Sequence, residues 1–260
     1  MKRSYVAYML LIATVCVCMS GCGHQTLGSP EHMADIAYVK GAEESAFTVF
    51  IQEGNTLVPY LVLTDDYNGN CLLLRKYLLP ESRTYNQNGD FAAYYENSLI
   101  DQWLNTDFRE TLAQPVRDLL INTSIEITSK DSLQGGEERV ITIAREIFLL
   151  SAREVNESGF RIAAVEGEWL EYFSSIERRT ASKDGVNASS WWLRTPDLWD
   201  ENVVFGVDPR GCVGIGGVGS AGADGEYRNG VRPAFCVSGD TAIYIHEGKY
   251  YLVPPEGTGN

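Results

Sequence analysis

Apolar residues in the first third of this chain fall into short runs separated by polar turns, a pattern typical of β-strands. Three such runs follow one another at residues 47–51, 59–64 and 71–75, and residues 65–70 (DDYNGN) separate the last two. Because Asn-Gly favours a tight hairpin turn, the last two runs are expected to pair as antiparallel strands.

A helical period replaces this pattern in the middle of the chain. Ser98 precedes an apolar run and can cap a helix that begins at Leu99. Apolar side chains then recur every three to four residues over 108–120, which predicts a second, amphipathic helix. Pro115 lies within that pattern and should kink or divide the helix. Residues 166–173 predict a further short helix.

The second half of the chain returns to strand-like segments. Strands are predicted at residues 125–127, 140–150, 190–196, 203–207 and 230–237, and near Ile243 and Tyr251. Strands at both ends with helices between them indicate an α+β fold with mostly antiparallel sheets. We expect a single domain over residues 47–255.

The N-terminus has the pattern of a secretory signal. Lys2 and Arg3 precede an apolar stretch at 5–17, and small residues lead to Cys22 in the run Met-Ser-Gly-Cys at 19–22. A cysteine directly after Ser-Gly resembles a bacterial lipoprotein signal, which implies cleavage before Cys22 and diacylation of its thiol. The alternatives are an ordinary secretion signal or an uncleaved anchor, although the apolar stretch is short for a spanning helix.

This resemblance predicts the location of the protein. Residues 1–21 would be the signal peptide and residues 22–46, rich in Gly, Ser, Pro and Glu, a lipidated flexible tether. Two acyl chains are sufficient for stable anchoring, so the domain would lie on the extracytoplasmic face of the cell membrane. Its partners there would be the membrane, through the lipid anchor, and an extracellular glycan or protein.

The charge of the chain argues against nucleic acid as a partner. The net charge is -14, and loss of Lys2 and Arg3 with the signal makes it more negative still. Phosphate binding requires clusters of basic residues, which this chain lacks. A solvated acidic surface that keeps the protein soluble accounts for the charge.

The cysteines and histidines do not predict a metal site. Without the signal and Cys22, three cysteines remain: Cys71, Cys212 and Cys236. They allow one disulfide, Cys212 with Cys236, plus a free thiol, or three free buried thiols. Their spacing does not match that of metal-binding cysteine and histidine motifs, and no cofactor is predicted.

Several segments together resemble an uncharacterised bacterial family of unknown function that occurs in secreted and phage-associated proteins. They are YLVLTDDYNGNCLLLRKYLLP, YYENSLIDQWLN, IFLLSAREV, WWLRTP and GVRPAF, within residues 47–240. WWLRTP and GVRPAF are the most specific. They also distantly resemble the C-type-lectin-like fold of formylglycine-generating enzymes and of the variable proteins of diversity-generating retroelements. That resemblance implies a lectin-like domain whose Trp-rich and terminal strands are neighbours, but it implies no function.

The motif residues Trp191, Trp192, Arg194 and Arg232 are expected to be mainly structural. Alternation along a strand places one tryptophan inward and the other sideways or outward. The arginines can stack on these rings or pair with buried acids. The alternative is an exposed platform for a sugar or peptide.

The glycine-rich segment 211–230 and its flanks are the predicted ligand surface. Long glycine-rich loops are either solvated connectors or binding loops on a rigid scaffold. Aromatic, acidic and arginine side chains, as used in glycan and peptide recognition, occur here. The candidate ligand-binding residues are Trp199, Asp208, Arg210, Asp224, Tyr227 and Arg228.

Catalytic residues are not predicted. Glu166, Glu168 and Glu171 have helical spacing and could act as paired carboxylates for glycoside hydrolysis, but the spacing favours a solvated helix face. Formylglycine-generating enzymes bind copper with a close pair of cysteines, whereas Cys212 and Cys236 are 24 residues apart. The sequence thus favours a non-catalytic recognition lipoprotein at the cell surface. The alternatives are a copper oxidase-like enzyme of that type and a structural envelope protein.

Overall fold

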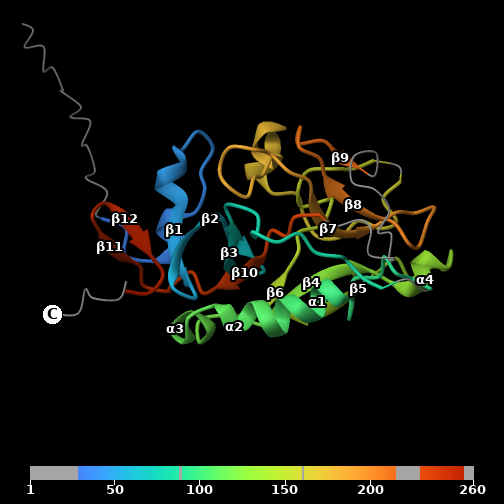
Figure 1. Ribbon diagram of the computed structural model, residues 1–260, viewed down its shortest axis with the longest axis horizontal. Helices are drawn as coiled ribbons and strands as arrows, with labels where there is room; N and C mark the ends of the chain where they lie inside the picture. The colour runs from blue at the N-terminus through green and yellow to red at the C-terminus, as the bar shows by residue number, and fades with distance from the viewer. Residues whose placement is uncertain (1–28, 88–89, 160, 215–228, 255–260) are drawn as a thin grey trace, which may run out of the picture.

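A seven-stranded sheet is the largest element of the fold. The computed structural model describes residues 29–87, 90–159, 161–214 and 229–254 (Figure 1). In spatial order the seven strands are β11 (Tyr244–His246), β12 (Lys249–Tyr251), β1 (Thr48–Glu53), β2 (Thr56–Tyr67), β3 (Asn70–Arg75), β10 (Ala234–Val237) and β6 (Ile147–Phe148). Only β1 and β12 pair in parallel, and the other neighbours are antiparallel.

The β2–β3 hairpin forms as the sequence predicts. Tyr67 pairs with Asn70 across a turn in which Asn68 and Gly69 both have positive φ, 53° and 77°. Positive φ at both central residues defines the hairpin turn that Asn-Gly favours. The Asn-Gly prediction is therefore confirmed.

Two smaller sheets accompany the large one. β4 (Thr123–Thr128) pairs with β5 (Val140–Arg145), and β7 (Trp191–Pro196), β8 (Val204–Val207) and β9 (Val213–Gly214) form the other. The single strand predicted over 140–150 is instead two: the chain leaves β5 at Glu146 and joins the large sheet as β6. The fold is α+β with mostly antiparallel sheets, as predicted.

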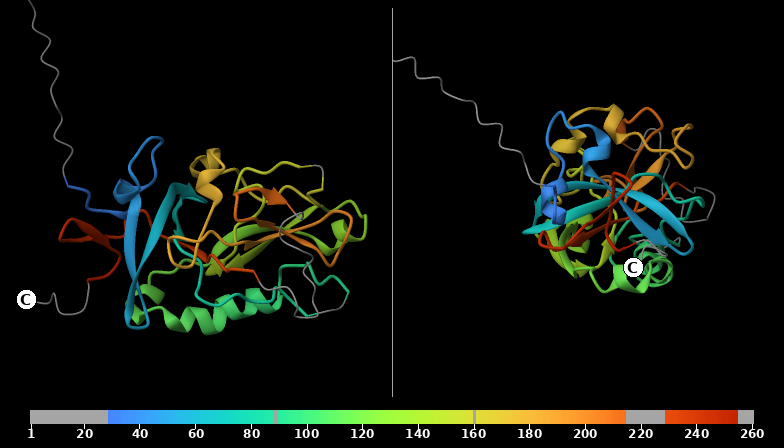
Figure 2. Two further views of the ribbon diagram at one scale, coloured as in Figure 1. Left: turned by 45° about the horizontal axis from the view of Figure 1, so that its top comes forward. Right: turned by 90° about the vertical axis from the view of Figure 1, so that its left-hand side faces the viewer.

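A row of helices runs along one side of the molecule, as both Figure 1 and Figure 2 show. It comprises α1 (Leu99–Trp103), the π-helical turn η3 (Leu104–Phe108), α2 (Arg109–Thr111) and α3 (Gln114–Arg117). The Ser98 hydroxyl accepts the backbone N–H of Asp101, which confirms the predicted cap. Leu112 is extended and Pro115 lies in the first turn of α3, so the predicted division of the second helix is also confirmed.

The remaining helices are short. They are α4 (Lys130–Leu133) and the 3₁₀ helices η1 (Met33–Ile36), η2 (Glu44–Phe47), η4 (Glu171–Ser174) and η5 (Glu177–Arg179). The helix predicted over 166–173 is wrong except for its last residues, which belong to η4. Within the described ranges, every helix is too short or too polar to cross a bilayer.

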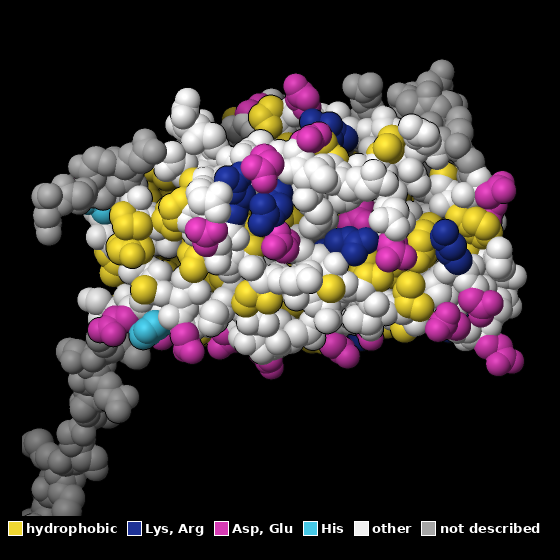
Figure 3. All heavy atoms as spheres, turned by 90° about the horizontal axis from the view of Figure 1, so that it is seen from below, with side chains coloured by type: hydrophobic (Ala, Val, Ile, Leu, Met, Phe, Trp, Pro, Cys, Tyr) yellow, Lys and Arg dark blue, Asp and Glu magenta, His cyan; other side chains and the backbone are white. Residues whose placement is uncertain are grey.

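The surface over α1 to α3 mixes charges of both signs. Figure 3 shows this face, where Lys and Arg side chains occur in small groups next to Asp and Glu. Arg145 pairs with Asp101 of α1 at 2.8 Å, and Arg117 of α3 pairs with Glu110. This face therefore presents no extended basic patch of the kind that binds phosphate backbones.

Folded structure begins before the predicted domain start. Met33 and Ile36, within the segment expected to be a tether, are buried in the core. The backbone N–H of Met33 donates to the carbonyl oxygen of Thr241 at 2.8 Å. The tether prediction is thus wrong for residues 29–46, because contacts with the C-terminal part of the chain order η1. The described N-terminal segment and the β11–β12 hairpin lie at the same end (Figures 1 and 2).

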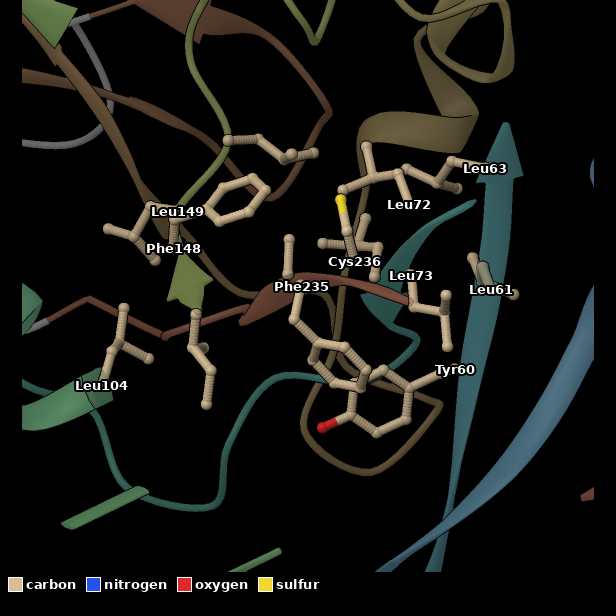
Figure 4. Packing of buried hydrophobic residues seen from close by; sticks show 14 of the residues in the cluster. Tyr60, Leu61, Leu63, Leu72, Leu73, Leu104, Phe148, Leu149, Phe235 and Cys236 are labelled. Atoms are coloured by element: carbon tan, nitrogen blue, oxygen red, sulfur yellow. The ribbon is translucent and has the colours of Figure 1, made fainter. Parts of the chain in front are cut away.

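The main core lies where β2, β3, β10 and β6 meet. Figure 4 shows Phe235 of β10 packed against Tyr60 of β2, with ring centroids 5.3 Å apart. Cys236 points to the opposite side of the sheet, towards Leu72. Because each such side chain contributes about 1.5–3 kcal/mol on burial, this core fixes β10 and the Gly-Val-Arg segment that precedes it.

Candidate functional site

Three of the six residues predicted as a ligand surface are described, and they lie at two places in the fold. Asp224, Tyr227 and Arg228 lie outside the described residues. Trp199 lies in the turn between β7 and β8 with 64% of its surface exposed. The guanidinium of Arg161 lies 4.6 Å from its ring centroid, and Arg161 also pairs with buried Asp197.

Asp208 and Arg210 lie at the other end of β8, in the turn to β9. The buried Asp208 carboxylate accepts the backbone N–H groups of Arg210 and Cys212, and the Arg210 guanidinium pairs with it at 2.6 Å. These hydrogen bonds are those of a turn, and they hold Asp208 in a structural role. The strand β8 lies between this turn and Trp199 in the chain.

Both tryptophans of the WWLRTP strand are buried, so neither is an exposed platform. The Trp191 indole donates to the carbonyl oxygen of Arg179 at 3.0 Å, and the Trp192 indole donates to that of Arg83 at 2.8 Å. A buried indole requires such an acceptor. The expected outward position of one ring is wrong because β7 is covered on both faces.

Arg194 is the centre of a buried polar network. Its Nη1 and Nη2 atoms each donate to Glu154 at 2.8 Å, and its Nε lies 3.6 Å from Glu166. All three side chains are fully buried. Burial alone favours a neutral Arg194, but the Glu154 carboxylate raises its pKa above the ordinary value, so the guanidinium stays charged. Arg194 thus pairs with buried acids, one of the two arrangements expected for the motif arginines.

Glu166 belongs to this network and not to a solvated helix face. Its carboxylate accepts the backbone N–H and hydroxyl of Thr128 and the hydroxyl of Thr195, all within 2.7 Å. Burial raises the pKa of Glu166, and the Arg194 charge and these hydrogen bonds oppose that rise. With its carboxylate oxygens hydrogen-bonded and its side chain buried, Glu166 stabilises the fold as part of this network.

Arg232 adopts the other expected arrangement. Its guanidinium lies 5.3 Å from the ring centroid of Trp191, and its Nε donates to the carbonyl oxygen of Arg75 at 2.9 Å. The side chain is only 2% exposed. Its Nη1, however, has no hydrogen-bond partner among the described residues.

Arg232 lines a cleft that the sequence did not predict. The cleft has a volume of about 380 Å³, and we refer to it as the arginine cleft. Its principal lining residues are Glu44, Lys76, Tyr77, Tyr172, Arg178 and Arg232. Glu44 belongs to η2 and Arg178 to η5, the blue and gold helical turns on the side of the molecule opposite α1 to α3 (Figure 1).

Arg178 is the second cation with an unused donor in the arginine cleft. Its guanidinium lies 4.7 Å from the ring centroid of Tyr38 and 5.3 Å from that of Tyr172. Its Nη1 is also buried, again with no hydrogen-bond partner in the described part of the chain. Cation–π contacts fix the position of a guanidinium without using its hydrogen-bond donors. Two guanidinium groups with free donors therefore line one cleft.

Two signature motifs and a glycine position the walls of the arginine cleft. Trp191 binds the carbonyl of Arg179, the residue after Arg178, and stacks on Arg232. Gly211 of the β8–β9 turn lies against Ile176, where an added Cβ would come within 2.2 Å of the Ile176 carbonyl oxygen. No pattern in the sequence distinguished Arg178 or Tyr172, because only long-range packing joins them to Arg232.

The cysteines do not form a copper site in the described structure. Cys71 and Cys236 are buried in β3 and β10, Cys212 is exposed, and all three are free thiols. The described residues contain no group of three histidine, cysteine or acidic side chains placed to hold a metal ion. Neither arrangement expected for the three thiols, a Cys212–Cys236 disulfide or three buried thiols, is present.

Comparison with known proteins identifies the family. The family described as a domain of unknown function (DUF6273) matches residues 68–239, more than half of the chain. No curated protein and no solved structure matches the chain. The matched range contains the WWLRTP strand, Arg178 and Arg232. The chain belongs to the DUF6273 family.

Proposed function

We propose that this protein is a lipid-anchored surface protein whose domain recognises an extracellular glycan or protein without catalysis. The observation that carries this proposal is the arginine cleft, in which Arg178 and Arg232 each have a buried Nη1 with no acceptor among the residues that the structure describes. Buried polar donors are otherwise almost always paired, so an unpaired set on a cleft favours a bound ligand that supplies the acceptor.

The side chains of the arginine cleft suit binding better than catalysis. Tyr77 is half-buried and Tyr172 is buried, and they offer ring surface and hydroxyl groups to a ligand. The arginines hold their protons throughout the physiological pH range and cannot act as general acids or bases there. Aromatic rings with arginine are the side chains that dominate recognition surfaces.

The fold is consistent with the proposed C-type-lectin-like architecture in one respect. Trp191 forms a parallel bridge with Gly230, so the Trp-rich strand lies beside the segment that leads to Arg232. The two strands nevertheless belong to different sheets, since β7 is in the three-stranded sheet and β10 in the seven-stranded one. The lectin-like relationship is part of this proposal and rests on that local adjacency.

The anchor is tested by lipid labelling. Cells that express the full chain are grown with an alkyne analogue of palmitate, and the protein is then recovered from the membrane fraction. Cys22→Ser is expected to abolish the label and to release the protein from the membrane. Labelling that persists in this variant contradicts lipidation at Cys22.

Recognition is tested on arrays of glycans and extracellular proteins with the full-length protein in detergent. The wild-type protein should bind a subset of the arrayed ligands, and the Arg178→Gln variant should lose this binding. Arg179→Gln is the matched control, because Arg179 is the adjacent arginine and its side chain does not line the arginine cleft. Absence of any binding contradicts the recognition function, and equal loss in both variants contradicts the assignment to the arginine cleft.

A further inference from the structure

Arg232 is a buried cation whose Nη1 has no hydrogen-bond acceptor among the described residues. Its Nε donates to the Arg75 carbonyl oxygen, and its guanidinium lies over the Trp191 ring. Within the described ranges no carboxylate forms an ion pair with it. Burying a charge without a partner is strongly unfavourable, because the protein interior replaces the hydration of that charge poorly. Among the described residues, this cation at 2% exposure therefore has no carboxylate within ion-pair distance.

Arg178 places a second cation around the same tyrosine. The Tyr172 ring lies 5.3 Å from the Arg178 guanidinium, and the charge of Arg232 also acts on the Tyr172 hydroxyl. The two arginines thus converge on Tyr172 in the arginine cleft. Two guanidinium groups that line one cleft, each with an Nη1 that no described residue accepts, are suited to the two oxygens of one anionic group.

The charge balance of the arginine cleft indicates a singly charged ligand group. Lys76 is paired with Glu44 at 2.5 Å, so these two charges offset each other. The remaining lining charges are those of Arg178, Arg232 and the exposed Glu177, which leave one net positive charge. A carboxylate neutralises this charge. A phosphate monoester, with about −1.5 to −2 charges, leaves an excess of negative charge next to Glu177.

The size and walls of the arginine cleft indicate what carries that carboxylate. A volume of about 380 Å³ lies at the lower end of the range for small-ligand pockets, roughly 300–1,000 Å³. The Tyr77 ring forms one wall and is itself packed against Gly185, where an added Cβ would lie 3.3 Å from a ring carbon. A sugar ring or a peptide end fits such a space and can pack on the tyrosine.

We propose that the arginine cleft binds one carboxylate group of its ligand between the Nη1 atoms of Arg178 and Arg232, with the adjoining sugar or peptide carbons packed on Tyr77. This inference rests on the proposed recognition function and names the chemical group that is recognised. The carboxylate can belong to an acidic sugar or to a peptide C-terminus, and the experiment separates these sources.

The test is isothermal titration calorimetry on the full-length protein in detergent at low salt. The probes are methyl glucuronide with its neutral counterpart methyl glucoside, a short peptide with a free C-terminus and its C-terminal amide, and inorganic phosphate. One carboxylate probe should bind at least about tenfold more tightly than its neutral counterpart and than phosphate. The probe that binds identifies the source as a glycan or a peptide.

Variants then connect binding to the arginine cleft. The Arg178→Gln variant should bind the carboxylate probe at least about tenfold more weakly than the wild-type protein. The Arg179→Gln variant should change the affinity for that probe by less than about twofold. Arg232→Lys keeps the charge but loses the planar fork, so it should also weaken binding. Because Arg232 is buried, the Arg232→Lys variant is first checked for unchanged tryptophan fluorescence. If Arg232→Lys fails that check, the result for Arg178→Gln decides the outcome.

The following results overturn the inference. These are a carboxylate probe that binds no better than its neutral counterpart, phosphate that binds more tightly than both carboxylates, and affinity that Arg178→Gln leaves unchanged. Absence of binding by either carboxylate probe at millimolar concentration has the same meaning. The array experiment separates failure of the carboxylate inference from failure of the recognition function. If array binding persists in the Arg178→Gln variant, the protein still recognises a ligand, but not through a carboxylate bound in the arginine cleft.

Discussion

Replacing Arg194 with methionine is expected to destabilise the fold by about 3–5 kcal/mol, the usual cost of removing one partner from a buried ion pair. The substitution removes two hydrogen bonds to Glu154 and those to the carbonyl oxygens of Leu149 and Glu126, all between 2.8 and 3.0 Å. It leaves two carboxylates, Glu154 and Glu166, buried without a countercharge.

A second substitution tests whether the unpaired charge is the cause. Glu154→Gln, added to Arg194→Met, removes one of the two orphaned charges and keeps a side chain that can still bond the Tyr67 hydroxyl and the Ser151 N–H. The double variant is expected to regain about 1–2 kcal/mol relative to Arg194→Met, a coupling of the size typical for contacting residues.

The assay is urea unfolding of each variant followed by tryptophan fluorescence and circular dichroism. Arg210→Met is the matched control, because Arg210 also pairs with a buried acid but its own side chain is 80% exposed. That substitution should change the free energy of unfolding by less than about 1 kcal/mol. If Arg194→Met is no more destabilising than Arg210→Met, the buried ion pair does not organise this fold.

Two further predictions concern the β8–β9 turn and the thiols. Gly211→Ala should destabilise the protein by about 1–3 kcal/mol, because φ is +83° and the new Cβ would meet the Ile176 carbonyl, whereas Gly248→Ala meets open space and should cost less in a thermal unfolding scan. Burial raises the pKa of the two thiols in β3 and β10 to about 12, so at pH 8 they are protonated, and iodoacetamide should modify exposed Cys212 first, as read by mass spectrometry. Equal losses of thermal stability in the two glycine variants, or equal labelling rates for the three thiols, would contradict these predictions.

Local signals in the sequence were sufficient for much of the fold. Asn68-Gly69 sets the β2–β3 hairpin, Ser98 caps α1, and Pro115 divides the helical row, because each acts through the backbone of its immediate neighbours. The start of the domain could not be predicted this way. Met33 is buried only because the chain near Thr241 returns to it, and nothing in the local sequence encodes that contact.

The candidate site was predictable only in its framework. The sequence identified Trp191 and Arg232 as structural, with the arginine stacked on a ring or paired with an acid, and Arg232 does stack on Trp191. It did not reveal that the same stacking leaves one guanidinium nitrogen without an acceptor. That property depends on Arg178 and Tyr172, which reach Arg232 only through tertiary packing.

Carboxylate binding in the arginine cleft is tested most directly by a crystal structure of the protein grown with the carboxylate probe that binds in calorimetry. The proposed site predicts electron density for that probe in the arginine cleft, with its carboxylate oxygens within hydrogen-bonding distance of Nη1 of Arg178 and of Arg232. A probe bound elsewhere, with both Nη1 atoms satisfied by oxygens of the protein itself, would contradict it.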